Sequence, residues 1–147
     1  MAHFQWNPTL STRIDAVDRE HRELLDLANR LQATIDDGRS AREISDLLSE
    51  LATRERRHFA REEQLMQEQQ FPGYADHKNA HDDLAAKLAN VQERFRAEEP
   101  IGSMTLLAFL HDWLVTHIHS HDRALGEYLT QKAAESVLPA QKTLKDD

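Results

Sequence analysis

Residues 56–66, with the sequence RRHFAREEQLM, contain the pair of side chains around which the chain is organised. His58 and Glu62 are four residues apart in a segment with the composition of a helix. On a helix this spacing places both side chains on one face, with their Cβ atoms about 6 Å apart. An imidazole and a carboxylate in this position can bind one metal ion or two neighbouring ions. A single pair of this kind is ordinarily a solvent-exposed His–Glu pair, so the other helices must decide between the two interpretations.

Four amphipathic segments follow one another, at residues 12–37, 41–70, 76–97 and 104–130. In each of them apolar residues recur in alternating steps of three and four, as in a helix that buries one stripe in a bundle. Gly38 ends the first segment, and residues 71–73 and 99–102 supply proline and glycine at the other two breaks. An arm at 1–11 and a tail at 131–147 flank the helices. We therefore expect one all-α domain spanning residues 1–147, folded as an up-down-up-down antiparallel four-helix bundle.

The stripe of each helix is apolar in one half and carries polar side chains in the other half. The polar positions are His21, His58, Glu62, His77, His81 and His117, with Asp122 beside the last stripe. Because neighbouring helices run antiparallel, counting residues from one end of the bundle places most of these groups in a slab about 10–15 Å thick. His77 fits this slab least well. Buried imidazoles and carboxylates need partners, and a metal centre satisfies many of them at once.

The number and kind of these side chains favour two iron ions over one zinc ion. Zinc is satisfied by four ligands, whereas five imidazoles and two carboxylates suit a pair of borderline ions bridged by the carboxylates. Di-iron bundles that activate dioxygen for oxidation are rich in carboxylates and use Glu-x-x-His pairs, whereas only two of the seven candidate ligands here are carboxylates. A histidine-rich site carries less negative charge, so reversible binding is the expected task. A buried polar network without metal is the alternative.

The composition excludes several classes of partner. The formal net charge is -8 and there is no block of Lys or Arg, so neither nucleic acid nor an anionic membrane is expected to bind. The chain has no cysteine, which excludes disulfides and thiolate metal sites. No apolar run approaches the ~20 residues of a membrane span, and the first residues, MAHFQWNPTL, lack the pattern of a signal peptide. We therefore expect a cytoplasmic protein.

Five motifs are spread over nearly the whole chain. They are Trp6 in the arm, Asp18-x-x-His21, His58-Phe-x-x-Glu62-Glu63, His77-x-x-x-His81 and Trp113-Leu-x-x-His117-Ile-x-x-x-Asp122. Each motif is weak alone, but together they resemble the bacterial hemerythrins. The resemblance implies a non-haem di-iron centre, bridged by an oxo or hydroxo group and by Glu62 and Asp122.

The resemblance also implies how the remaining residues divide between the two irons. One iron would take His77, His81 and His117, and the other would take His21 and His58. The second iron would keep an open position for dioxygen, in a pocket formed by Phe59, Leu114 and Ile118, with Trp113 packed nearby. We accordingly expect a dioxygen-binding protein for storage, delivery or sensing, and not an enzyme. The alternatives are an enzyme that acts on nitric oxide or peroxide, a donor of iron in repair, and a structural bundle without metal.

Two points stay open at this level. Helical spacing alone pairs His117 with His121, because Asp122 is turned by about 140° from His117; the motif selects Asp122. Glu55 lies one turn before His58 on the same stripe, where it could face solvent or hydrogen-bond to a ligand histidine. The remaining histidines, His3, His111, His119 and His121, are expected at the surface.

Overall fold

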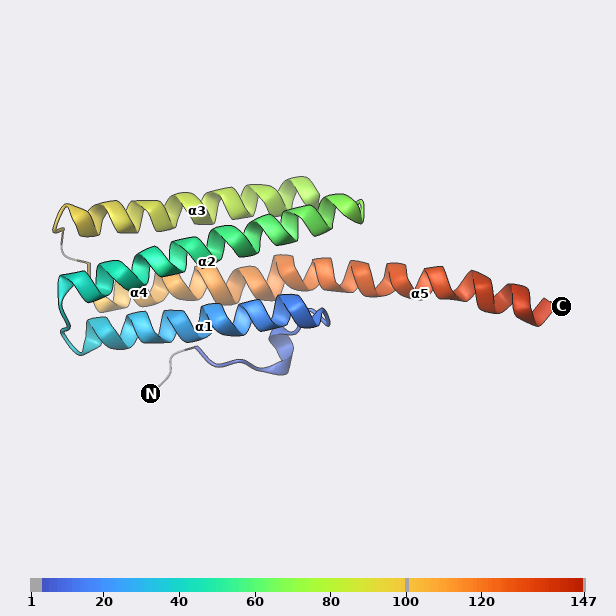
Figure 1. Cartoon of the computed structure of the whole chain (residues 1–147), viewed down its shortest axis with the longest axis horizontal. Coiled ribbons are helices and arrows are strands. Elements are labelled where there is room, and N and C mark those ends of the chain that lie inside the picture. The colour runs from blue at the N-terminus through green and yellow to red at the C-terminus, as the bar shows by residue number, and fades with distance from the viewer. Residues whose placement is uncertain (1–3, 100, 147) are drawn as a thin grey trace.

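The computed structural model consists of four antiparallel helical rods. It describes residues 4–99 and 101–146, and it describes side chains up to residue 135 except at position 103. The first three rods are α1 (Asp15–Asp36), α2 (Ala41–Glu68) and α3 (Tyr74–Arg96). The fourth consists of α4 (Ser103–Leu110), η2 (His111–Thr116), η3 (Ile118–Asp122) and α5 (Arg123–Asp146). Figure 1 shows these rods side by side, and no strand occurs in the described residues. The predicted all-α, antiparallel four-helix bundle is confirmed.

The turn between α1 and α2 follows the local sequence. Gly38 has a φ angle of 66°, in the left-handed region that glycine enters without a steric penalty. Two residues later the hydroxyl of Ser40 accepts a hydrogen bond from the backbone N–H of Glu43 and caps α2. These two residues reverse the chain and start the second rod.

The apolar halves of the stripes form the hydrophobic core. Each rod contributes a leucine that is at most 1% exposed, namely Leu31, Leu51, Leu88 and Leu110. Burying a side chain of this size contributes roughly 1.5–3 kcal/mol, so this part of the bundle has a stabilising core of its own. It holds the polar halves of the same helices in register.

The fourth rod departs from the expected α-helix at 104–130. Its backbone is π-helical over His111–Thr116 and Ile118–Asp122. A π-helix bonds each N–H to the carbonyl five residues earlier, so residues five apart come onto one face. The rod also does not end near residue 130: α5 continues to Asp146 and extends beyond the bundle (Figure 1). The residues after 130, QKAAE, are good helix formers and include no glycine, so nothing stops the helix there.

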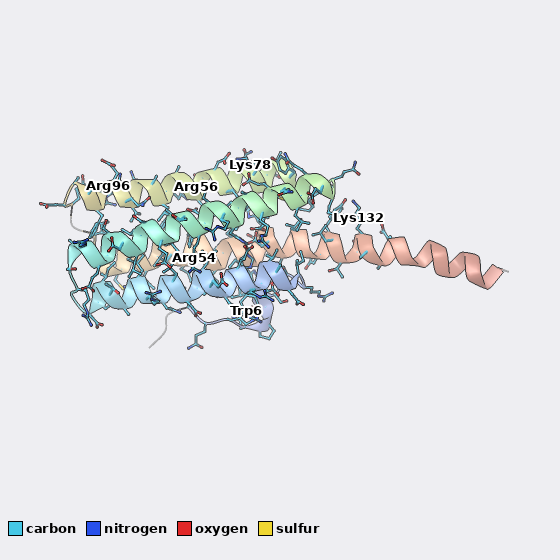
Figure 2. The ribbon with its side chains drawn as sticks, in the orientation of Figure 1. Trp6, Arg54, Arg56, Lys78, Arg96 and Lys132 are labelled. Carbon is cyan, nitrogen blue, oxygen red and sulfur yellow. The ribbon has the colours of Figure 1, made fainter. Side chains whose placement is uncertain are left out.

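The N-terminal arm is more ordered than its length suggested, since it contains a 3-10 turn, η1 (Pro8–Leu10). Asn29 of α1 holds Phe4 through two hydrogen bonds, from the Phe4 N–H at 2.8 Å and to the Phe4 carbonyl at 2.7 Å. Trp6 lies under α1 (Figure 2), with the Arg22 guanidinium 4.6 Å from its ring centre. The arm then approaches α5 so closely that a Cβ at Gly126 would collide with the Thr12 carbonyl oxygen. The arm therefore closes the end of the bundle that carries Asp122.

In the described residues, no helix combines the length and the apolar character needed to cross a membrane.

Candidate metal centre

The seven side chains predicted as metal ligands meet inside the bundle. Each rod contributes at least one of them, and all are at most 6% exposed: His21, His58, Glu62, His77, His81, His117 and Asp122. His77, which fitted the predicted slab least well, is only 1% exposed and belongs to the cluster. The polar halves of the four stripes therefore converge on one buried site.

The donor atoms form two sets that share Glu62 and Asp122. One set adds His77, His81 and His117 to these carboxylates, and the other adds His21 and His58. Within each set the donor atoms lie within 4.8 Å of one another. This is the arrangement of two adjacent sites joined by two carboxylates.

The contacts between these atoms are close but are not hydrogen bonds. His58 Nε2 lies 2.7 Å from Glu62 Oε1, and His21 Nε2 lies 2.8 Å from Asp122 Oδ2. Nevertheless these atoms have no hydrogen-bond partner, and the seven residues own eleven of the twelve buried side-chain atoms in this condition among the described residues. Buried polar atoms are normally hydrogen-bonded, and leaving one unpaired costs about 1–3 kcal/mol. Atoms that bind one ion at about 2.1 Å lie roughly 3 Å apart, so the donor set fits metal ions.

Two histidines of the cluster contact carboxylates outside it. His58 Nδ1 lies 3.0 Å from Glu20 Oε1, and His81 Nδ1 lies 2.9 Å from Glu63 Oε2. Such a contact fixes the ring so that its other nitrogen points at the metal. Each donor set has one of these pairs. The sequence provided no means of choosing Glu20 and Glu63, because several acidic residues flank each histidine.

Burial and mutual charge shift the pKa values of the cluster in different directions. Burial opposes protonation of His58, but the Glu62 and Glu20 carboxylates outweigh it and raise its pKa to about 10. Burial and the neighbouring His77 and His117 lower the pKa of His81 to about 2. Burial, reinforced by the charge of Asp122, raises the pKa of Glu62 well above its usual range. Since metal ligands are neutral imidazoles and ionised carboxylates, an ion held by His58 and Glu62 would displace protons from them.

The π-helical backbone decides between His121 and Asp122. Asp122 is 1% exposed, with Oδ1 3.1 Å from His117 Nε2, and it belongs to both donor sets. The α-helical spacing that places His121 beside His117 does not identify the cluster residue, because i→i+5 bonding brings the fifth residue, Asp122, onto the inner face. His121 is also not a plain surface residue: it is half-buried and its ring stacks on that of His117, with centroids 5.1 Å apart.

The other predicted surface histidines have mixed outcomes. His111 and His119 are exposed, as expected. His3 lies outside the described residues.

The predicted pocket residues are buried beside the cluster. Phe59, Trp113, Leu114 and Ile118 are each at most 8% exposed. The Phe59 ring stacks on His81 at 3.8 Å between centroids, and it lies 5.9 Å from His117 and 6.1 Å from His58. Phe59 is therefore close to histidines of both donor sets.

Neither alternative considered for Glu55 is correct. This side chain is 3% exposed, and its Oε1 accepts a hydrogen bond from the Trp113 indole N–H at 2.9 Å. Burial raises its pKa to about 7, against the opposing effect of the Trp113 hydrogen bond. The partner is 58 residues away in the chain, which is why local spacing did not reveal it.

Comparison with known proteins identifies the class of this centre. The family model described as the hemerythrin HHE cation binding domain matches residues 12–129. A bacteriohemerythrin of Stenotrophomonas maltophilia is 32% identical over 92% of this chain and 90% of its own length. A hemerythrin of Themiste dyscrita is 34% identical over 80% of this chain and 86% of its own length. A crystal structure of wild-type hemerythrin superposes with a TM-score of 0.79 at 32% identity, covering 86% of this chain and 97% of that one. The chain thus belongs to the hemerythrin family, whose domain binds a di-iron centre.

Proposed function

We propose that this chain binds dioxygen reversibly at its di-iron centre and serves in oxygen storage, delivery or sensing. The observation that carries the proposal is the unequal size of the two donor sets. One set has three histidines beside the shared carboxylates, and the other has two. The smaller set has one protein donor fewer, which leaves a position for an external ligand.

The residues of the chain would have distinct roles in this function. Glu62 and Asp122 would bridge the two ions, His77, His81 and His117 would hold one ion, and His21 and His58 would hold the other. When bound, the di-iron centre supplies the electrons and the coordination position that dioxygen needs. The buried side chains of Phe59, Leu114, Ile118 and Trp113 would exclude water and anions, which keeps protons away from the bound ligand.

The donor chemistry supports binding over oxidation. The described cluster contains five imidazoles and only two carboxylates. Neutral imidazoles stabilise high-valent iron less well than carboxylates do. A centre of this kind is suited to release dioxygen unchanged and not to use it in an oxidation, so an enzymatic role is not proposed.

Iron stoichiometry is the first test. Protein purified from iron-replete cells should contain about two irons per chain, because seven donors fit a pair of ions. Metal analysis by mass spectrometry measures this directly. A value near one iron per chain, or zinc in place of iron, would contradict the di-iron assignment.

Reversibility is the second test. The absorption spectrum of anaerobically reduced protein should change on exposure to air and return when dioxygen is removed, over repeated cycles. A Glu62→Ala variant provides a control without an intact centre and should show no such change. If the spectrum instead bleaches after one cycle, or if added nitric oxide or peroxide is consumed with turnover, the protein is an enzyme and the proposal is wrong.

A further inference from the structure

Glu55 is a buried carboxyl group that the proposed centre does not use. It projects from α2 one turn before His58, at a position of the stripe that is apolar at Leu48 and Leu51. Burying a carboxyl group is costly unless it is paired, so a leucine or glutamine would suit the core better. Its presence at this position needs a reason beyond packing.

The only described hydrogen bond between α2 and η2 is the one from Trp113 to Glu55. It joins the indole Nε1–H to Oε1 at 2.9 Å, with both side chains at most 3% exposed. Trp113 also stacks on Phe109, with ring centroids 6.4 Å apart. The indole is therefore held by two contacts: Glu55 of α2 binds its N–H edge, and Phe109 of its own rod packs on its ring face.

η2 forms a wall of the proposed dioxygen pocket. Leu114 follows Trp113 directly in this segment, and the ligand His117 comes three residues later. π-helical turns are rare and occur mostly as short segments within α-helices, frequently at functional sites. The position of Leu114 therefore depends on tertiary contacts that hold η2, and the Glu55 bond is one of these.

Glu55 also lies beside solvent. A surface groove of about 310 Å³ between α2 and α3 is lined by Glu55, Phe59 and His81, with Arg56 and Lys78 beside them. Figure 2 shows Arg56 on α2 and Lys78 on α3. Phe59, which stacks on His81 of the cluster, lines this groove together with Glu55, so the groove borders the proposed pocket.

We propose that Glu55 is a positioning residue, whose hydrogen bond to Trp113 fixes η2 and thereby keeps Leu114 closed over the ligand position of the centre. This inference rests on the proposed function, because it assigns Glu55 a part in controlling access of small ligands such as dioxygen and azide. Glu55 does not touch the ligand. It acts through Trp113.

The test compares Glu55→Leu with Glu55→Gln in a Trp6→Phe background, in which Trp113 is the single tryptophan. Leucine fills the space without an acceptor, whereas glutamine keeps an acceptor oxygen. In the iron-loaded ferric protein, Glu55→Leu should speed azide binding about tenfold, the factor expected for the loss of one buried hydrogen bond. Glu55→Gln should restore the parental rate to within about twofold, since the bond and not the charge is required. Iron content should not change.

Acrylamide quenching of Trp113 fluorescence in the iron-free protein tests the bond independently of the centre. Quenching should increase in Glu55→Leu and stay at the parental level in Glu55→Gln. The matched control is Glu50→Leu on the same helix, an exposed glutamate paired with Arg54, which should change neither quenching nor azide binding. If Glu55→Leu loses helix content, Glu55→Met replaces it.

Three outcomes would overturn the inference. Azide binding at the parental rate in Glu55→Leu would show that Glu55 does not hold the pocket, whatever the quenching. Equal acceleration by leucine and glutamine would show that charge, and not position, matters. Unchanged quenching in Glu55→Leu would show that Trp113 is held without Glu55. A parent protein that binds neither azide nor dioxygen would instead refute the proposed function, while the quenching comparison would still decide whether Glu55 holds Trp113.

Discussion

Glu62 is the residue on which both halves of the cluster depend. It is 0% exposed, with one oxygen 2.7 Å from His58 Nε2 and 3.7 Å from His81 Nε2, and the other 3.7 Å from His77 Nε2. Its carboxylate therefore faces histidines of both donor sets. A group in this position offsets the charge of two ions at once.

Replacing Glu62 should cost more iron than replacing any exposed histidine. Glu62→Ala should lose most of its iron, because both ions lose a shared donor and a compensating charge. His119→Ala should keep the parental content, since His119 is exposed and belongs to neither donor set. Iron per chain after purification measures both. Equal iron loss in the two variants would contradict the assignment of Glu62 as a bridge.

Glu55 should make the stability of the iron-free protein depend on pH. Burial raises the pKa of Glu55 in the folded state from its ordinary value of 4.5 to about 7, so the folded state binds more protons than the unfolded state between these two pH values. Stability contributed by the neutral form is present below pH 4.5 and is lost as pH rises through 7. Between pH 5 and pH 8 the loss amounts to roughly 2–3 kcal/mol.

Glu55→Gln should remove this dependence. The variant and the parent should have nearly equal free energies of unfolding at pH 5. At pH 8 the variant should be more stable by roughly 2–3 kcal/mol. Urea denaturation of the iron-free proteins at both pH values measures the difference. A difference between the proteins that is the same at both pH values would show that Glu55 titrates normally.

At the scale of the element, the fourth rod shows why local periodicity failed where it did. The period of 3.6 residues places His121 below His117 and turns Asp122 aside. In η3 (Ile118–Asp122) the backbone is wound more widely, so Asp122 faces the cluster and His121 moves to the half-buried flank. The same widening in η2 brings Trp113 and Leu114 together onto the buried side, at 2% and 3% exposure.

Leu114→Ala should open this element without disturbing the ligands. The packing cost is about 2–5 kcal/mol for a side chain that is 3% exposed. Iron content should survive, whereas the oxygenated form should decay faster to the ferric state and azide should bind faster, because water and anions gain access. Absorption spectroscopy follows both rates.

Leu106→Ala is the matched control for this variant. Leu106 is 2% exposed in α4, about two turns earlier in the same rod, so its replacement should lower the melting temperature without changing either rate. If Leu114→Ala decays at the parental rate, Leu114 is simply a core residue. If it loses iron, the substitution has disturbed the rod itself.

At the scale of the whole molecule, the bundle has two halves with different sources of stability. The apolar half is held by Leu31, Leu51, Leu88 and Leu110. In the described part of the chain, the polar half contains eleven of the twelve unpaired buried side-chain atoms, which a metal would satisfy. We therefore expect folding and metal binding to be coupled, with a bundle that still forms when the metal is absent.

Removing iron should leave a helical but less stable protein. Circular dichroism of the iron-free chain should retain most of the helical signal, because the leucine core is untouched. Its melting temperature should fall by about 10 °C, since ions that bind only the folded state stabilise it by mass action. Identical melting curves for the iron-loaded and iron-free forms would contradict a buried metal site. Complete loss of helix would show that the apolar half cannot fold alone.

Much of this protein follows from local sequence. The end of the first helix at Gly38 and the apolar and polar halves of each stripe depend only on residues within one or two turns. Periodicity was therefore enough to predict four antiparallel helices. The same reasoning explains why one-turn pairs such as His58 and Glu62 could be placed on one face. The assignment of each ligand to one of the two irons stays a prediction. The two donor sets found in the structure contain the same residues as the two sets that this assignment uses.

Tertiary structure alone decided the rest. The physical reason for Asp122 over His121 is π-helical winding, which a repeat of 3.6 residues cannot express, so only the resemblance to a family motif selected Asp122 from the sequence. The partners of Glu55, His58 and His81 are side chains between 18 and 58 residues distant in the chain. Several acidic residues could have reached each of these groups, and only the packing of one rod against another selects which of them does. Sequence determines what each helix must bury, whereas the assembled bundle determines which buried group meets which.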